Sequence, residues 1–273
     1  MKWGVIGTGN MGRILIEAWL EAGVMEQQDL YISNRSAHKS SQLKERFPDI
    51  HVAADNASLA DQVDILFICV KPLDIHPLLS DISNHLHHQQ CLISITSPYA
   101  VEELEDLVPC QVARIIPSIT NRALTGVSLL TFGKRVSPIM KGFIEQSVKL
   151  YSVPLEIDET ITRVSSDIVS CGPAFFSYLI QQFIDAACDE TLITKDEATA
   201  MMTEMLIGFG TLMKQGHYTL SSLQEKVCVK GGVTGEGIQI LEQELGDMFN
   251  QLFQKTHDKY AEDKREISAQ LKV

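Results

Sequence analysis

The sequence predicts an α/β protein, with a doubly wound parallel sheet in the N-terminal half and an all-helical C-terminal domain. Three observations support this fold class. Short apolar runs alternate with helical stretches over the first half of the chain, which is typical of βαβ units. The apolar run DILFICV at 64–70 is nearly continuous, as expected for a strand that is covered on both faces. Beyond about residue 157 every segment has the pattern of a helix.

The individual elements follow in order from these patterns. We expect strands at 3–7, 29–33, 64–70, 91–96, 111–117 and 126–132, and helices at 10–22, 37–47, from after residue 70 to about 86, and 136–150. Residues 151–157 fit an edge strand, because Pro154 has no N–H to donate to a central ladder. Further helices are expected at 159–170, 173–190, 195–214, 220–227, 236–246 and 247–264. We therefore predict a sheet domain over 1–155 and a helical domain over 156–273.

Composition limits the function classes. The 273 residues carry a formal net charge of −12 without a stripe of lysine or arginine, which argues against nucleic acid and anionic membranes as partners. No apolar run approaches the roughly 20 residues that span a bilayer. The N-terminus begins with a strand pattern and lacks the features of a signal peptide, so we expect a cytoplasmic protein. The six cysteines form no C-x-x-C pair, and no spacing typical of a metal site is present.

The helices at 173–190 and 195–214 are apolar nearly all round. A single core face does not require so much apolar surface. We expect this region to pack against its copy in a homodimer or a higher homo-oligomer. A larger monomeric core is the alternative.

A glycine pattern directly follows the first predicted strand and opens a helix. In GVIGTGNMG, glycines stand at 7, 9 and 12, the spacing of the dinucleotide fingerprint of Rossmann-like domains. The free N–H groups at a helix N-terminus suit the cofactor's pyrophosphate. We assign cofactor binding to Gly7, Thr8, Gly9, Asn10, Met11 and Gly12. The alternative is a strand–turn–helix without a ligand.

The second strand ends in Asn34, Arg35 and Ser36 rather than in an acidic residue. An acidic side chain would bind the ribose 2′-hydroxyl of NAD, whereas a guanidinium suits the 2′-phosphate of NADP. We therefore expect NADP(H), with NAD(H) possible, and an exposed turn residue is the alternative role for Arg35. The segment Val70-Lys71-Pro72 follows the strand at 64–70, near the edge where such sheets bind ligands, and is a further cofactor candidate.

With these pieces in order, the chain resembles the pyrroline-5-carboxylate reductase family over most of its length. The resemblance is carried by GVIGTGNMG, SNRS, Asp55-Asn56, DILFICVKP, RIIP at 114–117, SCGPAFF at 170–176 and KGGVTGEGIQILE at 230–242. It is strongest to the divergent, ComER-type late-competence proteins of Gram-positive bacteria. The resemblance implies a nicotinamide-dependent reduction of a cyclic imine to L-proline, with a helical domain that interleaves with a second subunit. It also places Asn56 and Pro117 at the cofactor.

The chain departs from the family pattern at three places. Pro-Asn-Thr-Pro, near the nicotinamide in the family, is replaced by Pro-Ser-Ile-Thr at 117–120, and an Ala-Gly pair by Ser97-Pro98. The substrate loop Ser-Pro-Gly-Gly-x-Thr is replaced by VKGGVT at 229–234. The altered positions bear on hydride positioning and on the choice of substrate.

The loop at 230–234 retains residues that suit substrate binding. Backbone N–H groups exposed at Gly231 and Gly232 before a helix bind a carboxylate well. We assign Thr234 as the catalytic residue that faces the ring nitrogen, with an N-cap as its alternative role. Substrate binding is assigned to Lys230, Gly231, Gly232 and Val233, and by resemblance to Gly172, Pro173 and Ala174. Pro173 also fits the first position of the long helix.

The leading hypothesis is NADPH-dependent reduction of 1-pyrroline-5-carboxylate to L-proline. The cofactor performs hydride transfer, so no metal or catalytic triad is required. One alternative keeps the chemistry and changes the substrate to another imine or a 2-keto acid. Another is a non-catalytic NADP-binding regulatory protein linked to competence. In each enzymatic case the binding partner is a small imine or amino-acid-like molecule.

Overall fold

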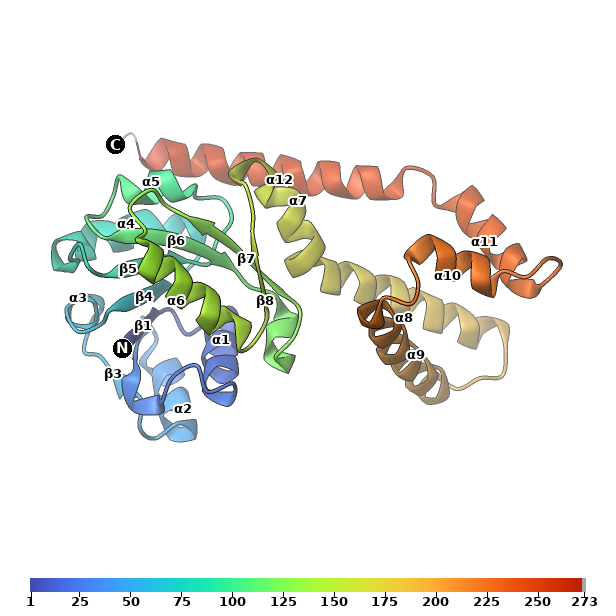
Figure 1. Cartoon of the computed structure of the whole chain (residues 1–273), viewed down its shortest axis with the longest axis horizontal. Coiled ribbons are helices and arrows are strands. Elements are labelled where there is room, and N and C mark those ends of the chain that lie inside the picture. The colour runs from blue at the N-terminus through green and yellow to red at the C-terminus, as the bar shows by residue number, and fades with distance from the viewer. Residues whose placement is uncertain (272–273) are drawn as a thin grey trace. The chain divides into compact units, whose positions relative to one another are not determined.

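The computed structural model describes residues 1–271, which form two compact units (Figure 1). The sheet unit contains the chain up to Pro173 and the C-terminal segment from Phe253 onward, and the helical unit contains Ala174–Leu252. These units do not coincide with the predicted cofactor domain at 1–155 and substrate domain at 156–273, because the sheet unit continues to Pro173 and also includes the C-terminal segment. The functional division itself stays a prediction.

One eight-stranded sheet forms the centre of the sheet unit. The strands are β1 (Trp3–Ile6), β2 (Leu30–Ser33), β3 (His51–Val52), β4 (Ile65–Ile68), β5 (Cys91–Ser94), β6 (Gln111–Ile116), β7 (Val127–Phe132) and β8 (Val153–Glu156). Their order is β3-β2-β1-β4-β5-β6-β7-β8, and every pairing is parallel except that of β6 with β7. The predicted fold class is confirmed, and β8 is the edge strand expected from Pro154.

Helices cover both faces of this sheet. On one face lie α1 (Asn10–Glu21), α2 (Ala37–Arg46) and α6 (Pro138–Lys149), and on the other lie α3 (Asn56–Ala60), α4 (Pro72–Ile82), α5 (Val101–Glu105) and the end of α12 (Met248–Gln270) (Figure 1). Strand residues alternate between the two cores, so that Trp3 and Val5 face α1 while Ile6 faces α4. β3, α3 and α5 were not predicted from the sequence, since elements of two to five residues are too short to show a period.

The remaining elements of the sheet unit are short. Single 3₁₀ turns occur at η1 (Gln27–Asp29), η2 (Ser83–His85), η3 (Ile119–Ala123) and η4 (Glu159–Ile161). After η4 the chain continues without a break through α7 (Thr162–Ser166), the π-helical segment η5 (Asp167–Cys171) and α8 (Gly172–Glu190). The prediction that Pro173 starts a helix is therefore wrong. A proline within a helix removes a backbone hydrogen bond, and the π-helical turn lies directly before it.

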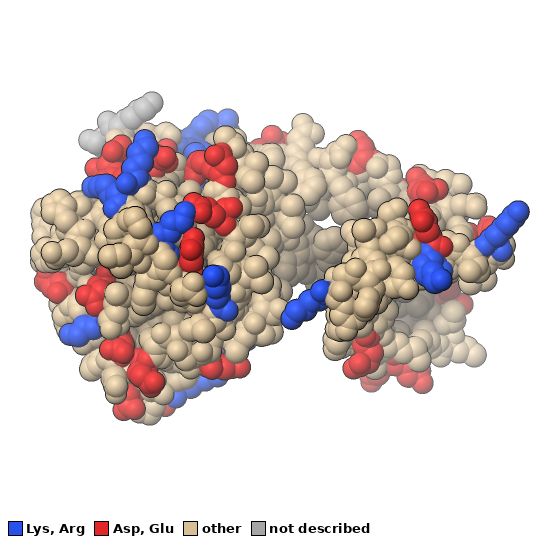
Figure 2. All heavy atoms as spheres, viewed as in Figure 1, with Lys and Arg blue, Asp and Glu red and all other residues tan. Residues whose placement is uncertain are grey.

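The helical unit consists of most of α8, then α9 (Lys195–Gln215), α10 (Leu220–Val227) and α11 (Val233–Glu244), and the first residues of α12. Large apolar side chains stand exposed over this unit, among them Phe176, Tyr178, Phe183, Met201, Met205, Ile207, Ile240 and Leu241. None of the helices in the described residues is long and apolar enough to cross a membrane. Figure 2 shows acidic and basic side chains interspersed on the visible face of the sheet unit.

Candidate functional site

The glycine loop between β1 and α1 allows close packing of backbone. Gly7 has φ +98°, and a Cβ atom there would lie 2.6 Å from the carbonyl oxygen of Cys69. A Cβ atom on Gly12 would lie 2.2 Å from the carbonyl oxygen of Gly7. Gly9 precedes α1 as its N-cap without a side-chain hydrogen bond. Among the described residues, apart from its two neighbours in the chain, none has an atom within 4 Å of a Cβ built on Gly9. The first N–H groups of α1 therefore open onto free space, which suits an anionic ligand.

Thr8 and Asn34 join this loop to the end of β2. The Thr8 backbone N–H donates to Asn34 Oδ1 at 3.0 Å, and Asn34 Nδ2 donates to the carbonyl oxygen of Ser36 at 3.0 Å. The Thr8 side chain is 4% exposed, yet its Oγ1 has no hydrogen-bond partner among the described residues. A buried hydroxyl without a partner costs about 1–3 kcal/mol. A bound dinucleotide that forms a hydrogen bond with Thr8 Oγ1 would remove this cost.

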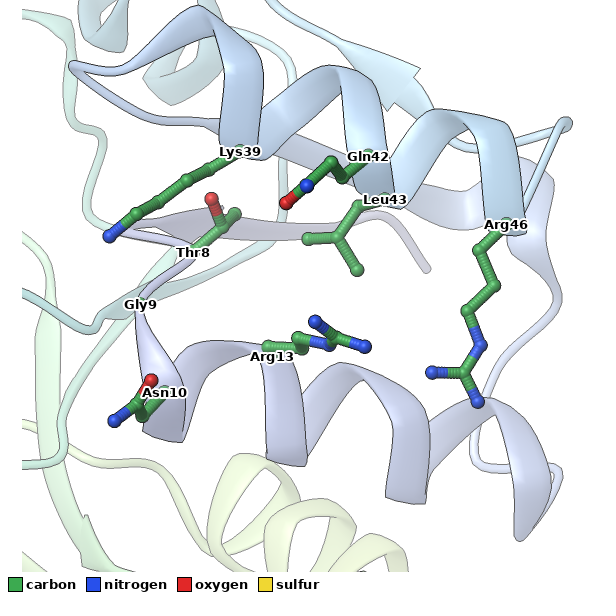
Figure 3. A pocket seen from close by; sticks show the side chains of 8 residues that line it. All are labelled: Thr8, Gly9, Asn10, Arg13, Lys39, Gln42, Leu43 and Arg46. Carbon is green, nitrogen blue, oxygen red and sulfur yellow. The ribbon is translucent and has the colours of Figure 1, made fainter.

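A cavity of ≈ 300 Å³ opens beside the loop, between α1 and α2 (Figure 3). Its lining comprises Thr8, Gly9, Asn10, Arg13, Lys39, Gln42, Leu43 and Arg46. Figure 3 shows Lys39, Gln42 and Arg46 on α2 opposite Arg13 on α1. The sequence analysis missed these cavity residues. The signal was available, because positions 39, 42, 43 and 46 follow helical spacing and therefore share one face of α2.

Part of the positive charge in this cavity is neutralised by Glu17. Arg13 Nε lies 2.8 Å from Glu17 Oε1, Arg46 pairs with the same carboxylate, and Arg122 Nε lies 2.9 Å from Oε2. Burial acts to raise the pKa of Glu17, but the hydrogen bond from Arg13 and the charges of Arg46 and Arg122 outweigh it, so the pKa lies below its ordinary value. Lys39 is exposed and contributes a further positive charge to the cavity lining.

The other predicted cofactor residues lie at the carboxyl ends of the strands. Arg35 and Ser36 are exposed directly before α2. Asn56 begins α3 and accepts a hydrogen bond from Ser33 Oγ at 2.7 Å. Lys71, exposed, is the N-cap of α4, with Val70 before it and Pro72 at the first helical position. Met11 is half-buried and packs against the core beneath the loop.

The segment after β6 is joined to the π-helical segment. Ser170 Oγ donates a hydrogen bond to the carbonyl oxygen of Pro117, which is buried. Gly172 is buried and Pro173 half-buried directly beyond this contact, while Ala174 is exposed and belongs to the helical unit. The structure thus brings predicted cofactor residue Pro117 close to the Ser170–Gly172 segment.

A polar cluster behind this contact was not predicted. Arg114 in β6 is 1% exposed and forms a bidentate ion pair with Glu159. Its guanidinium also donates hydrogen bonds to the Tyr99 carbonyl oxygen and to Thr162 Oγ1. A basic residue in an apolar strand, in the RIIP motif, was the available signal.

Arg163 extends this cluster to η5 and to the end of β5. Its Nη2 lies 2.9 Å from Asp167 Oδ1 and 3.4 Å from Cys171 Sγ, and its Nη1 donates to Ser97 Oγ at 3.4 Å. The Tyr260 hydroxyl on α12 donates to the Ser97 carbonyl oxygen at 3.2 Å. Burial raises the pKa of the Cys171 thiol, so it is protonated at neutral pH.

The predicted substrate loop lies within the helical unit. Gly231 has φ +75°, and the N–H of Gly232 donates to the carbonyl oxygen of Val229 at 2.9 Å. Gly232 is the N-cap of α11, which begins at Val233 rather than at the predicted residue 236. Thr234 is therefore the second residue of the helix, and its alternative role as an N-cap is excluded. Gly235 is the third residue of this helix and Gly237 the fifth.

The exposure of this loop suits a ligand site. Lys230, Gly231 and Val233 are exposed, and Thr234 is half-buried. By helix geometry the N–H groups of Val233 and Thr234 have no intrahelical acceptor, whereas the N–H of Gly235 donates to the Gly232 carbonyl oxygen at 3.2 Å. Glu236, also exposed in the first turn of α11, places a negative charge beside them.

Comparison with known proteins gives the family of the chain. The model for pyrroline-5-carboxylate reductase dimerisation matches residues 159–263, and the model described as NADP oxidoreductase coenzyme F420-dependent matches residues 2–98. ComE operon protein 4 of Bacillus subtilis (strain 168) is 53% identical over 273 residues, which is 100% of both chains. The chain belongs to the pyrroline-5-carboxylate reductase family, on a divergent branch with ComE operon protein 4.

Members of this family named as enzymes are more distant. Pyrroline-5-carboxylate reductase 3 of Bacillus subtilis (strain 168) is 26% identical over 259 residues, 94% of each chain. The solved pyrroline carboxylate reductase of Plasmodium falciparum with NADP bound has a TM-score of 0.84 at 21% identity, over 98% of each chain. That of Streptococcus pyogenes has a TM-score of 0.83 at 24% identity, over 95% of this chain and 98% of the other. These two structures share the fold of this NAD(P)-dependent oxidoreductase family member.

Proposed function

We propose that this protein is an NADPH-dependent reductase of cyclic imines, with 1-pyrroline-5-carboxylate as the expected substrate and L-proline as the product. The observation that carries the proposal is the glycine loop, in which the unpartnered Thr8 hydroxyl and the open start of α1 border a basic cavity. The family relatives named as pyrroline-5-carboxylate reductases support the reaction class.

The residues of the sheet unit fit NADP(H). The N–H groups that follow Gly9 suit the pyrophosphate, and Thr8 Oγ1 supplies a further hydrogen bond. Arg35, with Ser36 and Lys39 beside it, suits the 2′-phosphate, because a guanidinium pairs with phosphate through two parallel hydrogen bonds. When bound, the reduced cofactor supplies the hydride. The part of the protein in this step is to hold the reacting atoms in place, which contributes about 7–11 kcal/mol in well-oriented reactions.

The start of α11 is proposed to bind the substrate. The N–H groups of Gly231 and Val233, with the Lys230 ammonium, bind the carboxylate, whereas the Gly232 N–H between them is used by the Val229 carbonyl oxygen. The Thr234 hydroxyl hydrogen-bonds the ring nitrogen and orients the C=N bond. An iminium already carries its proton, so no strong general acid is required. Gly172, Pro173 and Ala174 are also proposed to bind substrate, on the family resemblance of their motif.

The protein is further proposed to form a homodimer through its helical unit. The exposed aromatic and aliphatic side chains of α8 and α9 support this proposal, because a soluble monomer seldom exposes such a large apolar patch. Sedimentation at micromolar concentration is expected to give a dimer or larger. A Phe183→Asp variant is expected to weaken the association, and a wild-type monomer at that concentration would contradict it.

The deciding experiment is NADPH oxidation by the purified protein with 1-pyrroline-5-carboxylate. Turnover is expected, with a loss of at least about tenfold in kcat/KM for Thr234→Ala, as for removal of one catalytic hydrogen bond. Thr199→Ala, an exposed threonine on α9, is the matched control and is expected to retain activity. No turnover of this compound would contradict the expected substrate.

A second candidate function rests on the 53% identity to ComE operon protein 4, a relative whose name does not describe an enzyme. In this case the protein binds NADP(H) and acts through a partner in competence. Tight NADPH binding without reduction of any imine or 2-keto acid would favour this function over the first. Reduction of another imine or of a 2-keto acid would instead indicate a reductase with a changed substrate.

A further inference from the structure

The segment that follows β6 uses its polar side chains internally. Ser118 is 1% exposed, and its Oγ accepts hydrogen bonds from the backbone N–H of Thr120 at 3.3 Å and from Thr120 Oγ1 at 2.9 Å. Asn121 is fully buried; its Oδ1 accepts from the Ser118 N–H at 2.8 Å, and its Nδ2 donates to the Thr125 carbonyl oxygen at 3.0 Å. The hydrogen bonds of these three side chains thus lie within the segment, apart from one that Asn121 Oδ1 accepts from Ser128 Oγ in β7 at 3.3 Å.

Close packing and backbone conformation hold this segment in one shape. Leu124 has φ 52°, a left-handed conformation that is costly for a leucine. A Cβ atom on Gly126 would lie 2.0 Å from Thr120 Oγ1, so the threonine packs directly on the glycine. Arg122 ties the same segment to α1 through Glu17 and Glu21. The segment is therefore pre-formed rather than adaptable.

One side chain of the segment faces outward. Ile119 is 46% exposed, although it lies two residues beyond Pro117, at the carboxyl edge of the sheet where ligands bind in doubly wound folds. The link from Ser170 to the Pro117 carbonyl oxygen holds the base of the segment in place. The side chain offered to a ligand here is therefore aliphatic and rigidly held, and the Thr120 hydroxyl proton and the Asn121 amide beside it are already used within the protein.

We propose that Ile119 determines substrate specificity by offering a hydrocarbon contact to the part of the substrate nearest the nicotinamide. The substrate class is then a cyclic imine with a carboxylate whose ring carries hydrocarbon, and not a hydroxyl, against this residue. This inference rests on the proposed function and deepens it. An enlarged or alkyl-substituted ring gains from the contact, whereas a hydroxylated ring must leave its hydroxyl unpaired.

Binding of saturated ring amines tests this independently of turnover. Calorimetric titration of the full-length, NADP⁺-loaded protein with L-pipecolate and with trans-4-hydroxy-L-proline gives the ratio of their dissociation constants. We expect tighter binding of L-pipecolate by about tenfold or more, the discrimination typical of a methylene in an apolar site. Ile119→Thr is expected to reduce this ratio by about tenfold, with the NADP⁺ dissociation constant unchanged within about twofold.

Ile139→Thr is the matched control, because Ile139 is 87% exposed at the start of α6. This helix follows the antiparallel strand β7 and starts beside the beginning of β6, at the opposite edge of the sheet from Ile119, so the ratio is expected to stay unchanged. Ile119→Ala is a second variant that keeps the test available if the threonine variant folds poorly, and it too should lower the ratio. An unchanged ratio in both Ile119 variants, or a failure of both amines to bind, would overturn the inference. Amine binding with the expected ratio but without turnover of any imine would contradict the proposed reductase and support the specificity.

Discussion

Arg114 in β6 and Glu159 in η4 form a bidentate ion pair, with Nη1 2.9 Å from Oε1 and Nη2 2.7 Å from Oε2. The guanidinium is fully buried, whereas the Glu159 side chain is 31% exposed. The pair therefore fixes η4, where the helical part of the chain begins, to an interior strand of the sheet. Water can therefore solvate the Glu159 carboxylate if its partner is lost, but it cannot reach the Arg114 guanidinium.

This asymmetry predicts the cost of removing the carboxylate. Glu159→Ala leaves a buried guanidinium without a counter-charge, which costs about 3–5 kcal/mol of unfolding free energy. Glu156→Ala is the matched control, because it removes an exposed pair with Lys141 that contributes about 0–1 kcal/mol. Urea denaturation of both variants measures the difference, and equal losses would show that burial of Arg114 does not matter.

Two glycines of the nucleotide loop are expected to respond differently to alanine. Gly12→Ala places Cβ against the Gly7 carbonyl oxygen and should lower the melting temperature of the ligand-free protein. The methyl group of Gly9→Ala meets no atom within 4 Å among the described residues beyond its two chain neighbours, and the variant should leave that temperature nearly unchanged. It should nonetheless weaken NADPH binding, since the added methyl group faces the ligand. Thermal unfolding and NADPH titration separate these effects, and wild-type affinity in Gly9→Ala would argue against a pyrophosphate at this loop.

The preference for NADPH over NADH is expected to depend on Arg35 and Lys39. Loss of a charge-assisted hydrogen bond costs about 1.5–3 kcal/mol, so Arg35→Ala should raise the NADPH dissociation constant by roughly tenfold or more. The NADH dissociation constant should not change, because NADH lacks the 2′-phosphate. Lys39→Ala should act in the same direction, and Lys134→Ala, an exposed lysine beyond β7, should have no effect. Fluorescence titration with both cofactors measures this, and an equal loss of affinity for NADH would refute the assignment.

The lowered pKa of Glu17 implies that its contribution to the unfolding free energy depends on pH. Its pKa is lowered in the folded protein, so its stabilising contribution is present above the unfolded-state pKa and is lost as the pH falls through the folded-state pKa. The difference in unfolding free energy between the wild type and Glu17→Gln should therefore be largest near neutral pH and decrease at acidic pH. Glu26→Gln, an exposed residue, is the control. Denaturation curves at several pH values provide the measurement, and a difference that grows toward acidic pH would have the wrong sign.

Much of the nucleotide half was predictable because its signals are local. The glycine spacing at 7, 9 and 12 depends on backbone geometry within one turn, and the apolar strand at 64–70 on burial of consecutive residues. The start of α11 was misplaced by three residues, since the glycines at 235 and 237 obscure the helical pattern of its first residues. The cavity residues on α2 were missed because their role depends on α1 lying opposite them.

The sequence by itself determined the class of fold, the place of the dinucleotide loop and the family pattern, because these depend on periodicity and on short motifs. Only the tertiary structure decided which polar side chains remain free. Ser118, Thr120 and Asn121 look equally available in the sequence, but hydrogen bonds within their own segment occupy them and leave Ile119 outward. Likewise, Arg114 becomes a buried ion-pair partner only when η4 brings Glu159 to β6. The availability of a polar group is set by partners distant in the chain, which local patterns do not contain.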